Sequence, residues 1–481
     1  QAQSFGSPAM RKLQMAEFAI SNFYVDKVDE DKLVEEAIIK MLAQLDPHST
    51  YSDAEEVKKM NEPLQGNFEG IGVQFQMIED TLLVVQPVSN GPSEKIGILA
   101  GDRIIAVNDS AIAGVKMSTE EIMKRLRGPK GSKVNLKIVR RGVQDPLVFT
   151  VKRDKIPILS LDASYMIQPK TGYIRINRFG ATTAEEFKKA MKELQKQGMK
   201  DMILDLQGNG GGYLNAAIDL ANEFLGQKEL IVYTEGRTAK RSDFYAKGNG
   251  EFRNGRLIVL VDEYTASASE IVSGAVQDWD RGIIVGRRSF GKGLVQRPID
   301  LPDGSMIRLT IARYYTPAGR CIQKPYDSST DYNKDLIERF NHGELMNADS
   351  IHFPDSLKVQ TKKLGRTVYG GGGIMPDYFV PIDTTLYTDY HRNLVAKGAV
   401  IKFTMKFIEG HRKELANKYK KFESFNEKFI IDDDMLATLR EMGEKEGVKF
   451  NEEQYQKSLP LIKTQLKALI ARDLWDMNEY F

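Results

Sequence analysis

The stretch TASASEIVSGAVQDWDRGIIVGRRSFGKGLVQ, residues 265–296, combines a helical pattern, a short apolar strand and a glycine-flanked lysine. Ser267 lies among small residues, and Lys292 stands between two glycines. A serine hydroxyl becomes a nucleophile when a base removes its proton, and that base is usually histidine. The chain has five histidines, but none lies in this stretch. Because burial or a nearby positive charge can lower the pKa of a lysine and populate its neutral amine, the stretch indicates a serine–lysine hydrolase site.

Strands and helices alternate on both sides of this stretch. Apolar strands are predicted at 172–176, 201–206, 256–262 and 282–286. The clearest helix is TTAEEFKKAMKELQKQG, which Gly198 closes. Alternation of this kind predicts crossover connections and a largely parallel sheet.

Changes in the pattern of apolar, polar and charged residues divide the chain into four predicted parts. Helical spacing marks the N-terminal segment, short strands with two helices mark the next module, and charged amphipathic helices mark the C-terminal end. We expect a multidomain α/β protein, since 481 residues exceed one ordinary hydrophobic core. The predicted parts are an N-terminal helical segment (1–65), a strand-rich module (66–155), an α/β core (156–380) and a helical C-terminal extension (381–481).

The composition excludes several classes of protein. The net charge is +2 and no basic run with interleaved aromatic residues appears, which argues against a nucleic-acid partner. No apolar stretch approaches the roughly 20 residues that a membrane span needs. Cys321 is the only cysteine, so the sequence has neither a disulfide framework nor a cysteine-rich metal site, and it fits an oxidising compartment. We interpret the start, QAQSFGSPAM, as the mature end left after signal removal, with a trimmed cytoplasmic start as the alternative.

Lys292 has a competing interpretation as part of a nucleotide site. Residues 286–292 fit the spacing of a phosphate-binding P-loop, and a predicted strand precedes them. The next residue, however, is Gly293 instead of the serine or threonine that would hold magnesium. The following LVQRPIDL has the pattern of a strand instead of the required helix. The nucleotide interpretation therefore fails, whereas a helix-capping role for Ser267 stays open beside catalysis.

A glycine cluster, DLQGNGGGYLN at residues 205–215, follows another predicted strand. A tight strand-to-helix turn is the simpler interpretation. The functional interpretation is an oxyanion site, because glycines let a backbone N–H approach a developing negative charge. Each such donor is worth about 100-fold in rate or more. The density of glycine after a buried strand favours the functional interpretation.

Together these motifs resemble those of the carboxyl-terminal processing peptidases, the serine–lysine proteases of serine peptidase family S41. The resemblance covers most of residues 20–380. TASASEI resembles the family's nucleophile motif, and FGKGLVQ resembles the lysine motif that follows 25 positions later. The resemblance implies that Ser267 is the nucleophile, that Lys292 is its general base and that Gln296 orients the lysine.

The glycine cluster resembles the family's DLRNNPGG turn. This resemblance implies an oxyanion hole formed by Gly211 and by the N–H of Ala268. Here Gln207, Gly208 and Gly210 replace the arginine, the first asparagine and the proline of that turn. A backbone donor does not depend on those side chains, but the changes leave open which glycine donates.

Asp278 and Cys321, two residues beside the motifs, are interpreted through the same resemblance. Asp278 lies where some members carry a functional aspartate, and a surface or helix-capping role is the alternative. YTPAGRCIQ (315–323) and GGGIMPD (371–377) resemble later core segments of the family. Cys321 is therefore expected to be an incidental buried thiol.

The strand-rich module resembles a PDZ domain, since GILAGDRIIAVN matches the pattern GLKAGDxIxxVNG. FEGIGV would then supply the loop whose N–H groups capture the terminal carboxylate of a peptide, which adds as a strand beside GVQFQ. The implied loop residues are Gly70, Ile71 and Gly72, with an ordinary glycine turn as the alternative. Arg127 in RLRGPKG is implied to couple peptide docking to the protease.

The resemblance implies a serine endopeptidase that cleaves protein substrates near their C-termini in the periplasm, after export. Its partners would be protein or peptide substrates bound by their C-termini, and it would need no metal or other cofactor. Whether an adaptor protein delivers the substrate and whether the chain forms a homo-oligomer stay open. The alternative function is a non-catalytic PDZ scaffold that binds C-terminal peptides, against which Ser267, Lys292 and Gln296 argue.

Overall fold

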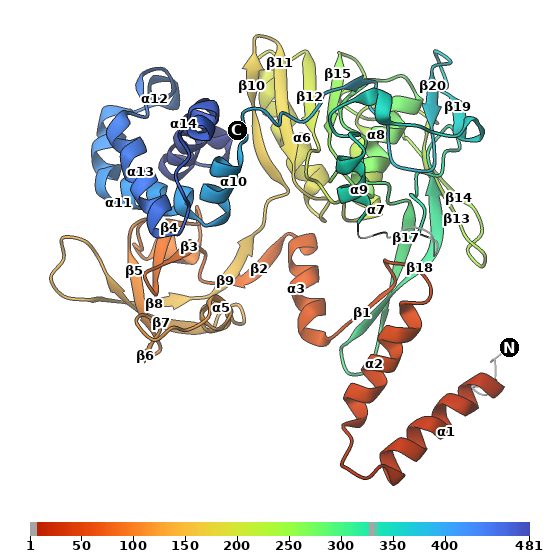
Figure 1. The fold of residues 1–481 in the computed structure, drawn as a ribbon, viewed down its shortest axis with the longest axis horizontal. Helices are drawn as coiled ribbons and strands as arrows, with labels where there is room; N and C mark the ends of the chain where they lie inside the picture. Colours follow the sequence, from red (N-terminus) through yellow and green to blue (C-terminus); the bar gives the residue numbers. More distant parts are fainter. Residues whose placement is uncertain (1–6, 327–331, 333) are drawn as a thin grey trace.

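The computed structural model describes residues 7–326, 332 and 334–481. Figure 1 shows projecting N-terminal helices, a small strand-rich module, a central α/β core and a C-terminal helical domain. In this view the C-terminal domain lies above the strand-rich module and beside the core. The predicted multidomain α/β architecture is confirmed.

The N-terminal segment consists of helices with little hydrophobic core of their own. α1 (Pro8–Phe23) has no buried residue, and Phe18 and Phe23 are 58% and 77% exposed. Asp53 forms a capping box with Glu56 and so fixes the start of the third helix. The other elements of the segment are α2 (Glu30–Leu42), β1 (Thr50–Ser52) and α3 (Ala54–Gln65).

The strand-rich module forms an antiparallel sheet of order β3-β4-β5-β7-β8, with β6 paired to β5. Burial alternates along β7 (Lys133–Val139), because Val134, Leu136 and Ile138 face the core of the module. β3 (Val73–Ile78) lies at the edge and therefore has one unpaired side. The remaining elements are β2 (Asn67–Gly70), β4 (Thr81–Pro87), α4 (Pro92–Lys95), β5 (Arg103–Val107), β6 (Ser110–Ala111), α5 (Thr119–Leu126), β8 (Leu147–Lys152) and β9 (Asp154–Pro157). The pair β2–β9 connects the module to the core.

The core contains a six-stranded sheet of order β10-β11-β12-β15-β16-β21. All neighbours from β11 to β21 are parallel, whereas β10 pairs antiparallel with β11 at the edge. The prediction of a largely parallel sheet is confirmed. The strands are β10 (Leu161–Gln168), β11 (Thr171–Ile176), β12 (Asp201–Asp205), β15 (Leu257–Val261), β16 (Ile283–Gly286) and β21 (Tyr378–Phe379). The helices packed with them are α6 (Thr183–Lys196), α7 (Leu214–Asn222) and α8 (Ala268–Asp278), of which α8 is buried at every residue.

A second sheet of five strands, antiparallel throughout, adjoins the core. β17 (Leu294–Asp300) directly follows Lys292 and pairs with β18 (Met306–Tyr315), so a strand stands where a P-loop needs a helix. β1 also pairs with β18, with Thr50 opposite Arg308, and brings the N-terminal segment to this sheet. The other elements of this part of the chain are β13 (Leu230–Glu235), β14 (Ser242–Tyr245), α9 (Asp335–Asn341), β19 (Lys358–Gln360) and β20 (Thr367–Tyr369).

The C-terminal domain has a hydrophobic core of its own, in which Leu394, Phe425 and Leu466 are completely buried. Its helices are α10 (Asp389–Ala396), α11 (Ala399–Lys418), α12 (Phe422–Lys428), α13 (Asp433–Lys445), α14 (Glu452–Leu474) and α15 (Met477–Tyr480). Within the described residues, no helix is both long enough and apolar enough to cross a membrane.

The C-terminal domain contacts two other regions of the chain. The carboxylate of Glu409 on α11 accepts two hydrogen bonds from Arg103 of the strand-rich module, at 2.9 and 3.1 Å. The side chain of Asn478 on α15 accepts the N–H of Ser164 at 2.7 Å and donates to its carbonyl at 3.2 Å, which caps the edge strand β10. The domain therefore joins the module to the core.

Candidate active site

Ser267 occupies a sharp turn between β15 and α8. Its φ of 58° lies in the left-handed region, which a serine adopts only where the surrounding structure imposes it. Thr265 fixes the turn, because its hydroxyl donates to the carbonyl of Leu206 at 2.9 Å and its N–H donates to Asp262 at 3.0 Å. The serine is thus held on the wall of a cavity and at the N-terminus of a buried helix, where the helix dipole stabilises negative charge.

Lys292 reaches the same cavity from the loop between β16 and β17. Its Nζ donates to Oε1 of Gln296 at 3.1 Å. The amide nitrogen of Gln296 donates in turn to the backbone carbonyl of His48, so the amide oxygen is turned toward the lysine. Gln296 therefore has the geometry to orient Lys292.

The pKa of Lys292 is lowered from its ordinary value, chiefly by burial and then by the positive charge of Arg308. Glu270 and Asp46 oppose this shift only in part. A lowered pKa populates the neutral amine closer to neutral pH, which is the form a general base requires. Among the described residues, however, no hydrogen bond joins Lys292 Nζ to Ser267 Oγ, so in this structure the amine faces Gln296.

The buried carboxylate of Glu270 connects the serine turn to the lysine loop. It accepts the N–H of Ser267 at 2.8 Å, of Gly291 at 2.7 Å and of Lys292 at 2.9 Å. It also accepts the hydroxyl of Ser289 at 2.5 Å, and burial raises its pKa. Because one side chain bonds to both backbones, the spacing between Ser267 and Lys292 depends on Glu270.

Sequence reasoning missed three residues of the site: Glu270, Tyr314 and His48. The hydroxyl of Tyr314 lies between the backbone carbonyls of Lys292 and Ser267, with 3.1 Å to the latter, so it ties the same two segments from the opposite side. Glu270 had a local signal, since a serine followed three residues later by glutamate is a capping-box pattern. His48 and Tyr314 had none, because they reach the site from other elements.

The glycine turn lies against the serine, as the motif implied. A Cβ on Gly211 would lie 2.8 Å from the Cβ of Ser267, so only glycine fits there. The N–H of Gly211, however, already donates to Asn209 Oδ1 at 2.9 Å, which leaves it engaged in this structure. The N–H groups of Gly212 and Ala268 donate to no acceptor within the described chain, and both residues line the cavity. Of the two glycine N–H groups, that of Gly212 therefore has no acceptor among the described residues, whereas that of Gly211 is engaged.

These groups share one cavity of about 620 Å³. Ser267, Lys292, Gln296 and the glycine turn line it, together with Met60, Asn61, Pro63 and Leu64 of α3. Its lining is mainly apolar, with a few convergent polar groups, as in sites that bind organic ligands. The cavity can therefore admit a peptide to the serine.

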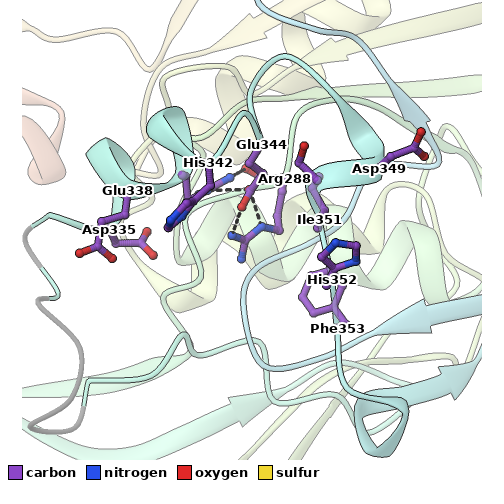
Figure 2. A pocket seen from close by; sticks show the side chains of 11 residues that line it. Arg288, Asp335, Glu338, His342, Glu344, Asp349, Ile351, His352 and Phe353 are labelled. Carbon is purple, nitrogen blue, oxygen red and sulfur yellow. Dashed lines mark hydrogen bonds and ion pairs between the residues drawn. The ribbon is translucent and has the colours of Figure 1, made fainter.

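A second cavity, of about 630 Å³, lies near α9 (Figure 2). Arg288 and Glu344 form an ion pair in its wall, with 2.6 Å between Nη2 and Oε2. None of the predicted site residues lines this cavity. In the described part of the chain, no three His, Cys, Asp or Glu side chains are grouped so that they could hold a metal ion.

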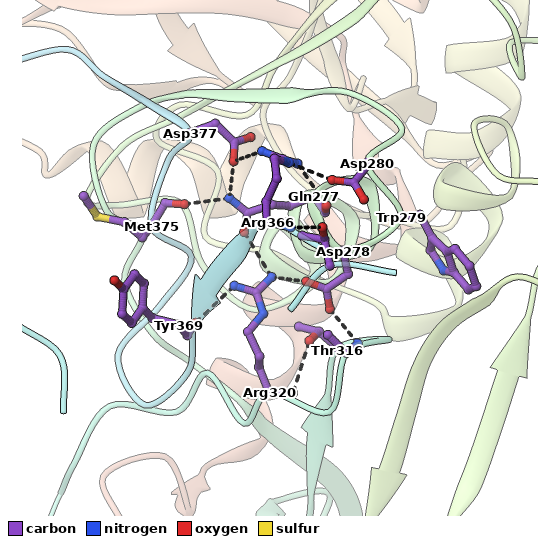
Figure 3. A network of polar contacts seen from close by, with 12 residues as sticks. Gln277, Asp278, Trp279, Asp280, Thr316, Arg320, Arg366, Tyr369, Met375 and Asp377 are labelled. Carbon is purple, nitrogen blue, oxygen red and sulfur yellow. Dashed lines mark hydrogen bonds and ion pairs between the residues drawn. The ribbon is translucent and has the colours of Figure 1, made fainter. Parts of the chain in front are cut away.

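Asp278 and Cys321 differ from their predicted surroundings. Asp278 is completely buried at the end of α8, where it forms an ion pair with Arg320 and accepts the N–H of Ala318 at 2.7 Å (Figure 3). The predicted surface or helix-capping role is therefore wrong, and Asp278 does not line the catalytic cavity either. Cys321 is half-buried instead of buried, and an isolated bridge pairs it with Tyr315.

The predicted carboxylate loop connects β2 to the edge strand β3. Gly70 pairs with Asp154 in the β2–β9 ladder, so it terminates that ladder. The N–H groups of Ile71 and Gly72 have no acceptor among the described residues. Gly72 has a φ of 72°, and a Cβ there would lie 2.9 Å from Ile156, so the loop depends on this glycine. Two free donors beside an unpaired strand edge suit a peptide terminus.

Arg127 connects the strand-rich module to the wall of the catalytic cavity. It lies at the end of α5, and its guanidinium donates to Glu62 on α3 at 2.5 Å. The same guanidinium stacks over Phe68, 4.8 Å from the ring centroid. Arg127 therefore contacts a helix of which other residues line the cavity.

Family models match most of the chain. That of peptidase family S41 matches residues 170–330, and that of the PDZ domain matches residues 70–155. The N-terminal domain of the activating protease CtpB matches residues 1–56. A family of unknown function matches residues 390–476, within the C-terminal helical domain.

Similar proteins include the carboxy-terminal processing protease CtpB of Bacillus subtilis, 37% identical over 327 residues that cover 67% of this chain and 68% of that protein. A carboxy-terminal-processing protease of Bartonella bacilliformis is 40% identical over 307 residues, which cover 62% and 69% of the two chains. Among solved structures, a photosystem II D1 C-terminal processing protease aligns over 79% of this chain and 95% of its own, with 27% identity and a TM-score of 0.39.

Proposed function

The chain belongs to the carboxy-terminal processing proteases of peptidase family S41, and we propose that it is a serine endopeptidase with a Ser267–Lys292 dyad. The chief support is the joint placement of Ser267, Lys292 and Gln296 in one cavity, with Glu270 bonded to the backbone of both dyad members. The proposed substrates are proteins cleaved near their C-termini and docked through the PDZ domain.

In the proposed reaction the neutral amine of Lys292 takes the proton of Ser267 as Oγ bonds to the scissile carbonyl carbon. The N–H groups of Ala268 and Gly212 stabilise the resulting oxyanion. When the C–N bond breaks, the lysine returns the proton to the leaving amine and an acyl-enzyme forms. Water then attacks the ester, gives a proton to Lys292 and releases the acid, with Ser267 regaining its proton.

Because Lys292 faces Gln296 in this structure, the dyad has to be aligned before it acts. We propose that a peptide in the PDZ domain, held by the N–H groups of Ile71 and Gly72, supplies the alignment. The path of contacts runs from the end of α5 through Arg127 and Glu62 to α3 and the cavity. A second connection joins Lys59 on α3 to Glu120 on α5 at 2.7 Å.

Arg127→Ala is expected to weaken this coupling. Stimulation of cleavage by a separate PDZ-binding peptide should fall about fivefold or more, as for loss of an ordinary allosteric coupling energy. Peptide affinity of the PDZ domain should stay within about twofold. The measurement is the rate of substrate cleavage as peptide is titrated. Lys130→Ala is the matched control, because Lys130 lies three residues away and pairs with Asp154, not with α3; equal stimulation in both variants would contradict the path.

The proposed activity is tested with an unfolded protein as substrate. The wild-type chain should produce fragments from the C-terminal region, as identified by mass spectrometry, and Ser267→Ala should produce none while still binding C-terminal peptides. If the wild-type chain binds such peptides but never cleaves, the scaffold alternative replaces the protease.

We also propose that the protein is exported to the periplasm and that copies assemble through the exposed apolar face of α1. The support for export is the near absence of cysteine. The support for assembly is the exposure of Phe18 and Phe23. Cell fractionation and light scattering of the purified chain test these two proposals; cytoplasmic recovery or a monomer at all concentrations would count against them.

A further inference from the structure

The charged side chains that line the cavity of Ser267 and Lys292 are all positive among the described residues. Of the described residues that line it, three are cations, Arg178, Lys292 and Arg308, and none is an aspartate or glutamate. Lys292 has a role in the proposed chemistry. Arg308 contributes to it only by lowering the pKa of Lys292, and Arg178 has no part in it, so a direct function of the two guanidinium groups needs a separate explanation.

Arg308 lies on β18, opposite Pro298 of β17 and Thr50 of β1. Its side chain is half-buried, and its one hydrogen bond in the described structure goes to the sulfur of Met60, which is a weak acceptor. Burial lowers the pKa of Arg308, consistent with a guanidinium that has lost water without gaining a carboxylate.

Arg178 also lines the cavity, next to the glycine turn. Its Nε donates to Asn177 at 2.7 Å, and no carboxylate in the described chain pairs with it. The following residue, Phe179, donates its N–H to the carbonyl of Gly211 at 2.9 Å. Arg178 is therefore fixed close to the proposed oxyanion site.

Several other poorly exposed arginines of the core have an acidic partner, whereas Arg281 donates to the backbone carbonyls of Phe224, Gly255 and Phe252 instead. The ion pairs are Arg287–Glu263 at 2.6 Å, Arg288–Glu344 at 2.6 Å and Arg175–Asp205 at 2.5 Å. A partly buried charge without such a partner is unfavourable unless a ligand completes it. Guanidinium groups bind carboxylates through two parallel hydrogen bonds, which makes a carboxylate the best-fitting ligand.

We propose that Arg308 and Arg178 bind a carboxylate of the substrate close to the scissile bond. This inference rests on the proposed protease function and narrows its substrate class. The carboxylate comes either from an Asp or Glu side chain within a few residues of the cleaved bond or from the terminus of a short leaving segment. A neutral peptide occupies the same cavity but leaves both guanidinium groups uncompensated.

The test uses peptides that differ only by Glu or Gln beside the cleaved bond, each with a free or an amidated C-terminus. For the wild-type chain, kcat/KM should be about 10- to 100-fold higher with the carboxylate, as expected for hydrogen bonds to charged groups. The Glu/Gln pair reports side-chain carboxylates, and the free/amidated pair reports the terminus. Arg308→Gln and Arg178→Gln should each lower the preference for at least one of these sources toward unity.

Each variant is judged by the ratio of its kcat/KM values for two peptides, not by its absolute rate. Arg308 also lowers the pKa of Lys292, so the loss of Arg308 slows cleavage of every peptide at neutral pH. If Arg308→Gln and Arg178→Gln still cleave peptides with a free C-terminus faster than amidated peptides, the remaining difference is due to binding of the terminus by the PDZ loop. Arg297→Gln is the matched control: this arginine lies on β17, is exposed and does not line the cavity, so it should keep the wild-type ratios.

The outcomes separate this inference from the proposed function. If the wild-type chain cleaves Glu and Gln peptides and both terminal forms equally well, the inference is overturned while the protease stands. The same holds if both arginine variants retain the wild-type ratios. If the wild-type chain cleaves no peptide, both proposals fail. Should Arg308→Gln unfold, as its melting temperature will show, Arg178→Gln decides alone.

Discussion

Lys292→Met should lower kcat by about 10,000-fold, because removal of the proposed general base leaves the serine hydroxyl protonated. Methionine keeps the length and the apolar stem of the side chain but has no proton acceptor of comparable basicity. Lys292 has no ion-pair partner in the described structure. The substitution therefore leaves no buried carboxylate without its partner, and the melting temperature should change little. The measurement is single-turnover cleavage of an unfolded protein by the folded variant.

Lys292→Arg separates basicity from charge. Arginine keeps the positive charge but does not deprotonate in proteins, so this variant should be as inactive as Lys292→Met. A variant that retains more than about one hundredth of wild-type kcat would show that the charge, not proton transfer, is what matters, since a lost base costs at least about 100-fold.

The pH profile of the wild-type chain gives an independent check. Below the pKa of Lys292 the amine is protonated and cannot accept the serine proton, so kcat/KM should rise with pH and level off above that pKa. Since burial and Arg308 lower this pKa, the rise should lie below the pH range of an ordinary lysine. A rise centred on the ordinary value would indicate that the amine is not desolvated.

Asp278→Ala should destabilise the core by about 3–5 kcal/mol, because it leaves Arg320 buried without its acidic partner. Both side chains are fully buried, and Arg320 also bonds Gln277 at 3.0 Å and the carbonyl of Tyr369 at 3.0 Å (Figure 3). The measurement is the unfolding transition of the core by calorimetry. Protein that stays folded should still cleave, since Asp278 lies outside the catalytic cavity.

A double variant controls for this interpretation. Asp278→Ala combined with Arg320→Met removes both charges, so it should be more stable than Asp278→Ala alone. Glu453→Ala removes one side of an exposed ion pair with Lys457 and should leave the transition unchanged. If Asp278→Ala keeps wild-type stability but loses activity, the residue acts in catalysis and the structural account of Asp278 is wrong.

Local patterns predicted the fold class well. The strands β11, β12, β15 and β16 are parallel, as apolar runs that alternate with helices predict. A continuous apolar run indicates a strand that is buried on both faces of the sheet. The strand after Lys292 was likewise predicted from its own pattern, and it removed the nucleotide interpretation. The strands, the helices and their order depend on residues that lie close together in the sequence, so they can be predicted from the sequence.

The direction of a single N–H and the surroundings of a side chain were less predictable. Gly211 belongs to the expected turn, but a contact with Asn209 decides that its N–H is already engaged in a hydrogen bond. Asp278 follows Ser267 by eleven positions, and the local pattern indicates a polar helix end, yet Arg320, which lies in the chain after β18, pairs with it in the core. A charged residue at a helix end carries no local sign of a distant partner.

The sequence by itself determined which serine and lysine stand in the expected motifs and that a strand-rich module precedes an α/β core. Only the tertiary structure decided what surrounds them: the carbonyl of His48, 248 positions from Gln296, and Arg308, brought in by β18. The physical reason is that periodicity records which face of an element is buried, whereas contacts between elements are set by sheet pairing and packing. The charge of the cavity, and with it the proposed preference for a carboxylate, follows from those contacts.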